Sequence, residues 1–402
     1  MNILFVAVGS IVSQNGYITR IIDEARILSS HKNSLIFYVP ISEYIDFNIL
    51  QKTSPIKKLL KDTFDSVHIY PTLNYIHFSF LKGFFLRRLI SRYEVEILYA
   101  ESTAAGYILS KIRTSIPYIL DLHGFSEYET ILRSKAKNRG SVASFFARKI
   151  SQDLDKSSIL RSNKIVAVSE RMRIHLGEKY NYPLKNITVM QCYPREISVK
   201  EKLSEWKKSR QSIRKKLAIQ KNTTVLGYLG GMGVYQMIDA IVIFFKDYNN
   251  HNNNSLLLMI VVGDISKLNN LIENFKLKNK IIILNNIPHS EVSSYLCSID
   301  FGIIFREQDP VNYYASPTKF GEYVSAGVPL LVSKNIGDFD TLILNNDLGI
   351  IINKNLSADK KLIDRMATQI LYRENIAKKI ISWADNEYNW KVVKKEFNKL
   401  FD

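Results

Sequence analysis

Short runs of hydrophobic residues recur along the first half of the chain, each bounded by polar residues or glycine. They span residues 2–8, 34–40, 95–100, 117–122 and 164–169, and most are separated by stretches long enough for a helix. Short, continuously apolar strands that alternate with helices are typical of a parallel sheet covered on both faces. The pattern therefore predicts a doubly wound α/β domain.

The same alternation starts again in the second half of the chain. The apolar runs there span residues 223–231, 256–264, 280–286, 299–305, 328–333 and 348–353. Between the two series, residues from about 185 to 222 break the pattern and hold the highly charged stretch EKLSEWKKSRQSIRKKL. We therefore expect two Rossmann-like domains, residues 1–195 and 196–380, whose parallel sheets face an interdomain cleft.

The stretch SPTKFGEYVSAG predicts a helix with an unusual first turn. Ser316 is typical of an N-cap, Pro317 of the first helical position and Gly327 of a helix end, so we expect a helix from Pro317 to Ala326. Lys319 then lies in the first turn, where the helix already presents positive charge. A bound phosphate would explain a cation there, and a solvated surface lysine is the alternative.

Glu322 follows Lys319 by three residues and therefore lies on nearly the same helix face. Its carboxylate can accept hydrogen bonds from two neighbouring sugar hydroxyls, as the acid of dinucleotide-binding folds does with a ribose. An ion pair with Lys319 is the alternative. With Ser316 and Thr318 in the same polar turn, the stretch predicts a nucleotide site.

Glycines in two predicted strand-to-helix turns can bring backbone N–H groups to a ligand. In GYLGGMGVYQ, Gly231 and Gly233 can cradle a phosphate, and Arg306, at the end of another predicted strand, can add charge. Gly16, in SQNGYITR, either lets the backbone approach a ligand or is a plain turn glycine. A dinucleotide fingerprint fits poorly, because no acid follows about 20 residues later, so neither nicotinamide nor flavin is expected.

The chain carries 55 Lys and Arg against 38 acids, a net charge of +17, which favours an anionic partner unless it reflects genomic composition. Residues 81–93 combine apolar side chains with Arg87, Arg88 and Arg92, and residues 131–149 hold six bases and no acid. Both segments suit an anionic membrane surface. A core helix with a solvated basic face is the alternative for the first. Nucleic acid is not expected, because no recognised binding motif accompanies the charge.

The cysteines and the chain start exclude several classes of protein. Cys192 and Cys297 lie far apart, and there is no His cluster or Asp-x-Asp motif, so neither a disulfide framework nor a metal site is expected. The first apolar run is short and has no preceding base, which favours a buried strand over a signal peptide. No stretch approaches the roughly 18 to 20 apolar residues of a spanning helix. We expect a cytoplasmic protein, soluble or peripheral at the inner face of the membrane.

Three stretches, VLGYLGGMGVYQMIDAI, SPTKFGEYVSAGVPLLVS and W…EYNWKVVKKEFNKLF, occur in an order that resembles retaining glycosyltransferases of family four, which have the GT-B fold. The resemblance implies transfer of a sugar from a nucleotide-diphosphate sugar, with UDP preferred over GDP, to a glycan or lipid-linked acceptor in surface polysaccharide or glycolipid synthesis. The C-terminal domain would hold the donor, with Glu322 on the ribose and Lys319 on the diphosphate. The N-terminal domain would hold the acceptor. Residues 381–402 would form a helix that packs back toward the N-terminal domain.

Two positions depart from the pattern of that family. The family usually has a second glutamate eight residues before Glu322, touching the donor hexose, and this chain has Tyr314 there. Glu307 and Asp309 are the candidates to replace this glutamate. The family also commonly carries an Arg and a Lys after the glycine turn, whereas residues 231–237 contain neither.

His123 follows the predicted strand 117–122 and is the candidate catalytic residue. A similar His in the family contacts the donor sugar and helps to stabilise charge as the nucleotide leaves; a histidine simply packed at a cleft is the alternative. Glu101, Glu127 and Glu129 are lesser candidates for acceptor binding. A nucleotide-sugar epimerase of the same fold and a non-catalytic protein that binds membranes or nucleic acid are the alternative functions.

Overall fold

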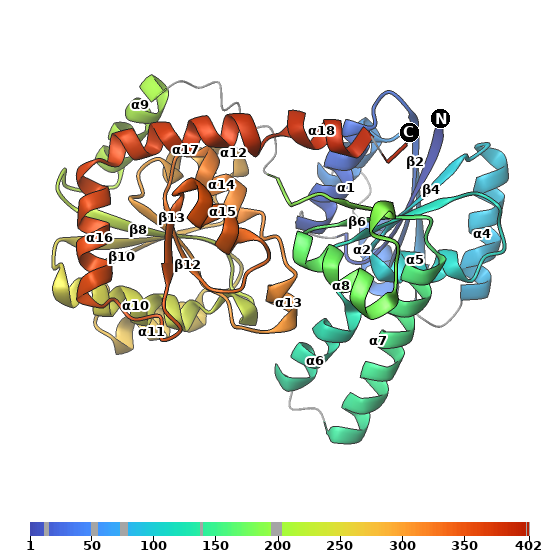
Figure 1. The fold of residues 1–402 in the computed structure, drawn as a ribbon, viewed down its shortest axis with the longest axis horizontal. Coiled ribbons are helices and arrows are strands. Elements are labelled where there is room, and N and C mark those ends of the chain that lie inside the picture. Colours follow the sequence, from blue (N-terminus) through green and yellow to red (C-terminus); the bar gives the residue numbers. More distant parts are fainter. Residues whose placement is uncertain are drawn as a thin grey trace. The chain divides into compact units, whose positions relative to one another are not determined.

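The computed structural model describes residues 1–11, 16–49, 55–72, 79–136, 140–193, 203–398 and 400–401. The chain divides into two compact units, whose elements Figure 1 labels. Unit 1 consists of Met1–Gln191 with Val393–Asp402, and unit 2 consists of Cys192–Val392. The chain therefore leaves unit 1 once and returns to it near its end.

A parallel sheet of seven strands, in the order β3-β2-β1-β4-β5-β6-β7, forms the centre of unit 1. The strands are β1 (Asn2–Val8), β2 (Lys32–Pro40), β3 (Ser66–Thr72), β4 (Ile97–Glu101), β5 (Tyr118–Leu122), β6 (Lys164–Ala167) and β7 (Ile187–Val189). The central strands are almost wholly buried because helices cover both faces of the sheet. In the register of β4 with β5, Glu101 lies beside Asp121.

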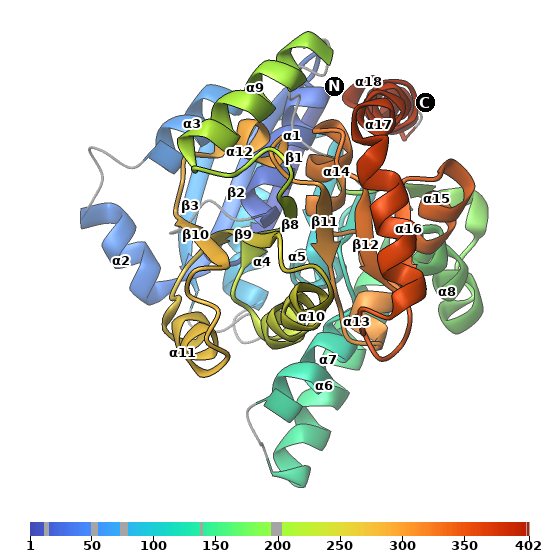
Figure 2. The same ribbon diagram turned by 90° about the vertical axis from the view of Figure 1, so that its left-hand side faces the viewer.

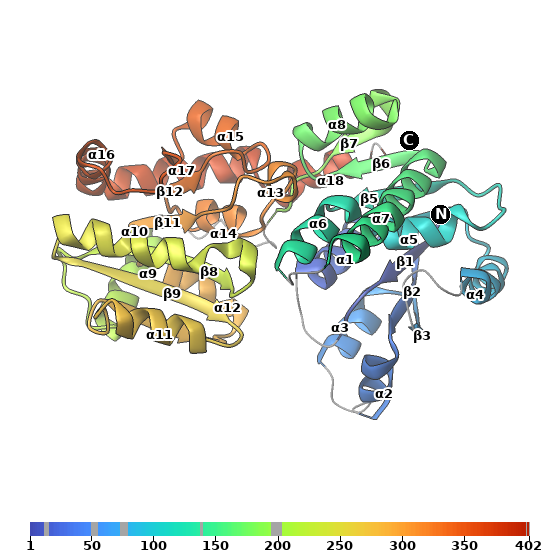
Figure 3. The same cartoon turned by 90° about the horizontal axis from the view of Figure 1, so that it is seen from below.

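Eight helices within the described ranges surround this sheet, with α2 and α3 near its β3 edge (Figure 3). Their bounds are α1 (Gly16–Ile27), α2 (Ile41–Ile49), α3 (Pro55–Thr63), α4 (Ser79–Arg92), α5 (Ser102–Ser110), α6 (Ser126–Ala136), α7 (Ser141–Arg161) and α8 (Glu170–Tyr180). Helices α6 and α7 run side by side and project beyond the sheet of unit 1 (Figure 1).

The end of the chain completes the core of unit 1. Phe397, in α18 (Trp390–Asn398), is fully buried, and its ring lies 5.9 Å from that of Tyr99 in β4. Leu400 is also buried, and Lys164 Nζ donates a hydrogen bond of 2.6 Å to its carbonyl oxygen. The last turns of the chain are therefore part of the fold of its first half.

A second parallel sheet, in the order β10-β9-β8-β11-β12-β13, forms the centre of unit 2. The strands are β8 (Thr224–Gly231), β9 (Ser255–Val262), β10 (Ile281–Asn285), β11 (Phe301–Ile304), β12 (Leu330–Ser333) and β13 (Gly349–Ile352). Two buried hydrophobic clusters lie on its two faces, and Figure 2 shows α10 and α11 on one face and α9, α12 and α14 on the other. The helices are α9 (Leu203–Lys216), α10 (Ile238–His251), α11 (Ser266–Asn274), α12 (His289–Leu296), α13 (Pro310–Tyr313), α14 (Lys319–Ser325), α15 (Phe339–Asn346), α16 (Lys360–Leu371) and α17 (Arg373–Glu387).

The charged stretch that interrupts the sequence pattern forms α9 and is anchored to unit 2. Arg210 Nη2 pairs with Asp300 Oδ1 at 2.5 Å, and Arg214 Nη1 lies 3.5 Å from Asp300 Oδ2. Arg373 of α17 lies 3.9 Å from the same carboxylate. One buried aspartate therefore gathers arginines from two helices.

The eleven strands that the hydrophobic pattern predicts are confirmed with shifts of a few residues at their ends, and β3 and β7 were missed. β3 is only half-buried and contains Pro71, and β7 has three residues, so neither forms a long apolar run. None of the helices in the described ranges is both long and apolar enough to cross a membrane.

Candidate functional site

The glycine turn at the end of β8 lies against Lys319 of α14. Gly230 has φ of 139°, and a Cβ atom there would lie 2.9 Å from Lys319 Nζ, so glycine leaves room for the ammonium. Lys319 Nζ donates to Gln236 Oε1 at 2.6 Å and lies 4.5 Å from the ring centre of Tyr228. Burial and the nearby Arg306 hold the pKa of Lys319 well below its ordinary value.

Arg306 follows β11 and reaches the same turn. Its main chain is fixed by Ser333, whose Oγ accepts from Arg306 N at 2.8 Å, and its Nη1 donates to the carbonyl of Tyr235 at 3.0 Å. Its Nε is buried without a hydrogen-bond partner, and burial lowers the pKa of the guanidinium. The glycine turn after β8 and Arg306 after β11 are thus brought together by neighbouring strands, and Lys319 reaches the same turn from the start of α14.

Helix α14 begins at Lys319 and not at Pro317, so the predicted N-cap role of Ser316 is wrong. Ser316 is buried, and its Oγ accepts a hydrogen bond from Cys192 N at 2.9 Å. Thr318 precedes the helix and makes no side-chain cap. The predicted end is confirmed, because Gly327 follows the helix with φ of 66°.

Glu322 does not form the alternative ion pair with Lys319. Its Oε1 lies 3.2 Å from Nε2 of His289, the first residue of α12, and its side chain is mostly buried. His289 is itself exposed. The carboxylate therefore has a partner that can move away without disturbing the core.

The two acids considered in place of the missing family glutamate have different surroundings. Asp309 caps α13, because its Oδ1 accepts from Asn312 N at 3.0 Å and its Oδ2 accepts from Asn312 Nδ2 at 2.8 Å. Glu307 is exposed. Tyr314 is half-buried, with its ring 5.1 Å from that of Tyr313. Asp309 thus has a structural task, which leaves Glu307 as the better candidate.

In unit 1, His123 lies directly after β5, at the carboxyl end of the sheet. Its Nε2 lies 2.5 Å from Asp121 Oδ2 and 3.6 Å from Glu101 Oε2. Tyr17 of α1 lies beside it, with ring centres 5.6 Å apart. Gly16 begins α1 and is exposed, with open space where a Cβ would lie.

Two residues that sequence reasoning did not find complete this cluster, Arg20 and Glu24 of α1. Arg20 donates to both oxygens of Asp121, from Nε at 2.7 Å and from Nη2 at 2.9 Å. Although burial alone raises it, Arg20 and His123 hold the pKa of Asp121 below its ordinary value. The spacing of Arg20 and Glu24 by four residues was a possible signal in the sequence, because it places them on one helix face.

Glu127 and Glu129, the other acids considered for the acceptor, both have partners in unit 1. Glu127 is buried and accepts from Gln152 at 2.8 Å and from Lys179 at 2.7 Å, with Arg148 on the same carboxylate. Glu129 forms an ion pair with Arg133 on α6. Glu127 therefore links α6 to α7 and α8.

Comparisons with known proteins were made on the sequence and on the fold. Two family models match the chain, Glycosyltransferase Family 4 over residues 54–192 and Glycosyl transferases group 1 over residues 209–386. Among curated proteins, none matches the sequence closely enough to count as a relative.

Many solved structures resemble the chain over nearly its whole length. WaaG, described as a glycosyltransferase involved in lipopolysaccharide biosynthesis, is 12% identical with a TM-score of 0.71 over 99% of each chain. HepE of Anabaena, solved in complex with UDP and glucose, is 12% identical with a TM-score of 0.67 over 100% of this chain and 99% of its own. A glycosyltransferase from Rickettsia africae is 16% identical with a TM-score of 0.65 over 100% and 99%.

The two parallel-sheet Rossmann-like units and these neighbours define the GT-B fold. The two family matches together span most of the chain and agree with the motifs around the glycine turn and α14. The chain belongs to the family-four, group 1 glycosyltransferases.

Proposed function

We propose that this glycosyltransferase moves a hexose from a nucleotide-diphosphate sugar to a glycan or lipid-linked acceptor, with retention, in the synthesis of a bacterial-type surface polysaccharide or glycolipid. One observation carries the donor class: Arg306 and Lys319 are buried cations that donate hydrogen bonds to neutral groups, a carbonyl and an amide. Buried cations without a carboxylate partner favour an anionic ligand, and a diphosphate fits two of them.

In this proposal the diphosphate binds Lys319, the open Nε of Arg306 and the N–H groups of Gly231 and Gly233. The charges of the side chains carry the contact, because α14 has only seven residues and its dipole is small. Glu322 exchanges His289 for the ribose hydroxyls. Because HepE is described in complex with UDP, uridine is the first base to test.

Ser316 and Thr318 were predicted to contribute to the same nucleotide site. Thr318 can contact the nucleotide directly, because it is exposed at the start of α14. Ser316 contributes indirectly, because its hydroxyl fixes the preceding segment through Cys192. Glu307 takes the place of the missing glutamate on the hexose.

Unit 1 contributes the acceptor site and His123. The imidazole contacts the donor hexose, while Gly16 allows a close approach of the backbone. A retaining transfer requires no general base, so neither Glu101 nor Asp121 is assigned that role.

Donor binding can be tested before the acceptor is known. We expect UDP to raise the melting temperature more than GDP or ADP, since a ligand at 100 times its Kd adds about 2.7 kcal/mol of stability. Transfer is then measured with UDP-hexoses and lipid-linked acceptors, and the anomeric configuration of the product by NMR. The proposal would be refuted if no nucleoside diphosphate stabilised the protein.

The same proposal places the enzyme at an anionic membrane surface on the cytoplasmic side. The first half of helix α7 exposes four large apolar side chains, Val142, Phe145, Phe146 and Ile150. A shallow cleft of about 410 Å³ between α6 and α7 is lined by Lys135, Arg148 and the serines 134, 141 and 144. Bases beside exposed aromatic residues suit the headgroup region of an anionic bilayer, and they disfavour pairing with a second copy, whose face would carry the same charge.

One polar atom that lines this cleft has no hydrogen-bond partner. Ser134 is 8% exposed, and its Oγ is buried without a hydrogen-bond partner. Lys137 and Arg139, which belong to the predicted basic segment, lie outside the described residues. Arg87, Arg88 and Arg92 of α4 are exposed, whereas Leu86 and Leu89 are buried, so α4 has both the core face and the basic face that the sequence allows.

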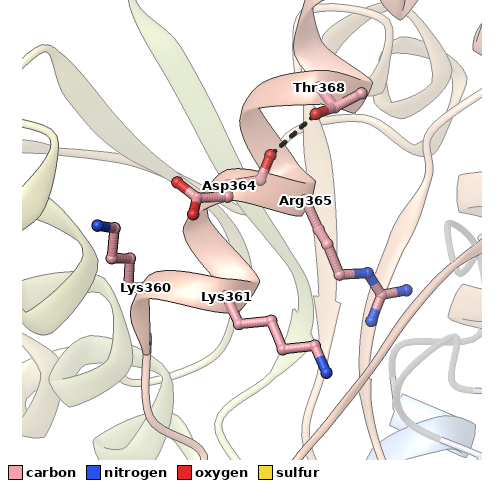
Figure 4. Close-up of a pocket in the computed structure, with 5 residues that line it drawn as sticks. All are labelled: Lys360, Lys361, Asp364, Arg365 and Thr368. Atoms are coloured by element: carbon pink, nitrogen blue, oxygen red, sulfur yellow. Dashed lines mark hydrogen bonds between the residues drawn. The ribbon is translucent and has the colours of Figure 1, made fainter.

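Liposome binding tests the membrane proposal. Changing Lys135 and Lys149 to Gln should weaken binding to acidic liposomes about 30-fold, at about 1 kcal/mol for each base near the surface. The control removes the same charge from unit 2, by changing Lys360 and Lys361 to Gln in the pocket of about 560 Å³ on α16 (Figure 4). Equal losses in the two variants would show a general charge effect and overturn the assignment to α6 and α7.

Two further variants separate the contributions to membrane binding. Changing Phe145 and Phe146 to Ser should weaken binding that persists at high salt, since salt screens charges and not apolar insertion. The Arg87, Arg88 and Arg92 to Gln variant tests α4 in the same way. If it binds acidic liposomes like the parent, α4 takes no part.

A further inference from the structure

Three carboxyl groups meet beneath His123, and almost none of their surface reaches solvent. Glu101 and Asp121 end neighbouring strands in register, and Glu24 approaches them from α1. Their exposed fractions are 0%, 0% and 2%. Arg20 is the one cation in contact with them among the described residues apart from the imidazole, at 2.7 Å from Asp121 and 2.8 Å from Glu24.

The charges of this cluster do not balance if every acid is ionised. Three carboxylates against Arg20 leave two uncompensated negative charges at positions that are almost inaccessible to solvent, and such groups take up protons instead. Two protons on the three carboxyls make the cluster neutral.

The hydrogen-bond pattern indicates where the protons are. The four oxygens of Glu24 and Glu101 are buried and accept no hydrogen bond. Arg20 Nε lies 2.8 Å from Glu24 Oε1, but it donates its hydrogen bond to Asp121. Glu24 interacts with both Asp121 and Glu101, and buried carboxyls that face each other are stabilised by sharing protons. Asp121 differs, because Arg20 donates to both of its oxygens.

We propose that Glu24 and Glu101 are protonated and Asp121 is ionised at neutral pH, and that this cluster positions His123 with the proton of Nε2 on Asp121. The role of His123 in sugar transfer rests on the proposed function. Asp121 touches the imidazole, while Arg20, Glu24 and Glu101 act through Asp121, so all four are positioning residues. The hydrogen bond of 2.5 Å between His123 Nε2 and Asp121 Oδ2 fixes the tautomer of the imidazole. Asp121 does not contact the other ring nitrogen, Nδ1.

The electrostatics of the surrounding groups support this arrangement. Burial first, and then Asp121, raise the pKa of Glu24 and of Glu101 well above the ordinary range. The two tyrosines that face the cluster stay neutral: burial raises the pKa of Tyr17 and of Tyr99. The hydroxyl of Tyr99 is buried without a hydrogen-bond partner and can donate to a carboxyl oxygen.

A metal ion is the competing occupant. Donor atoms of Glu101, Asp121 and His123 all lie within 4.8 Å of one another, so they could hold an ion. However, the guanidinium of Arg20 already occupies both oxygens of Asp121. The separation of 2.5 Å between His123 Nε2 and Asp121 Oδ2 is a hydrogen-bond length, whereas two ligands of a tetrahedral zinc stand about 3.3 Å apart.

Infrared spectroscopy tests the protonation directly. At neutral pH, Glu24→Gln and Glu101→Gln should each remove intensity from the C=O band of protonated carboxylic acids, whereas the exposed control Glu374→Gln should remove carboxylate intensity. Neutral, isosteric replacements should leave the fold intact. Loss of carboxylate intensity in the first two variants would overturn the proposal. So would loss of the acid band when Zn²⁺ or Mn²⁺ alone is added to the wild-type protein.

Nitrogen NMR of the imidazole tests the positioning. We expect wild type and Glu101→Gln to hold the His123 proton on Nε2, and Asp121→Asn to lose that single tautomer. A purely structural role of Asp121 would leave the tautomer unchanged and refute the inference. In transfer assays, Asp121→Asn should lower kcat about 10- to 100-fold with little change in the donor KM.

The two spectroscopic measurements do not depend on turnover, so they separate the two levels of inference. If the protein transfers no sugar and yet shows the protonated carboxyls and the fixed tautomer, the cluster stands and the proposed function fails. If transfer occurs without either signature, only the cluster assignment fails.

Discussion

Replacing Lys319 with methionine removes a buried ammonium and keeps a long, flexible side chain of similar size. In the free protein that ammonium has an amide partner, Gln236, and an aromatic one, Tyr228. A hydrogen bond between charged groups is worth about 1.5–3 kcal/mol, so the variant should bind UDP about 10- to 150-fold more weakly. Uridine, which has no phosphate, should bind with nearly unchanged affinity.

The same variant should change the proton balance of binding. Burial and Arg306 lower the pKa of Lys319 in the free protein, and a diphosphate favours the charged form and raises it. At a pH between these two values, binding of UDP takes up a proton. The heat of binding of the wild type should therefore depend on the ionisation enthalpy of the buffer, and that of Lys319→Met should not.

Titration calorimetry of UDP and of uridine, in two buffers at one pH, measures both effects. The thermal stability of Lys319→Met is the control for folding. It should be no lower than that of the wild type, because an apolar side chain is easier to bury than an ammonium. Equal loss of affinity for UDP and uridine would show that Lys319 does not contact phosphate.

Three further predictions concern the acids and the metal. Glu322→Gln should weaken UDP and uridine alike, through a weaker acceptor for the ribose hydroxyls, and unchanged affinity for both would remove Glu322 from the site. Transfer should survive EDTA, and strict dependence on Mn²⁺ or Mg²⁺ would contradict the use of Lys319 and Arg306 against the phosphate charge. Because the folded-state pKa of Glu24 and of Glu101 is raised from 4.5, the folded protein keeps protons that the unfolded chain releases. Urea unfolding should show wild-type stability falling relative to Glu24→Gln or Glu101→Gln as pH rises above 4.5, by up to about 1.4 kcal/mol per pH unit for each group, and parallel curves would refute it.

The parts of the fold that could be predicted from the sequence are those with local causes. A strand buried on both faces must be apolar throughout, and such runs locate the central strands of both sheets. Lys319, Arg306 and His123 could be selected because each follows such a strand or lies in a turn at a strand end. The apolar pattern does not predict β3, because its residues are only half-buried and include Pro71.

The parts that could not be predicted depend on residues far apart in the sequence. Ser316 satisfies the local rule for an N-cap, but its hydroxyl is taken by the backbone of Cys192, 124 residues away. Arg20 and Asp121 are 101 residues apart, and neither is unusual in its own segment. Gln236 meets Lys319 over a separation of 83 residues. No local pattern encodes these pairs, because the sheet order that joins them is a property of the whole unit.

The return of the chain to unit 1 has a consequence for how the protein is made. Synthesis proceeds from the N-terminus, and domains generally fold as they emerge from the ribosome. Unit 1 lacks Phe397 and Leu400 until α18 has been synthesised, so Tyr99 and Lys164 have no such partners while unit 2 is being made. A stop codon just before α18 would therefore damage unit 1, most of which was translated about 200 residues earlier.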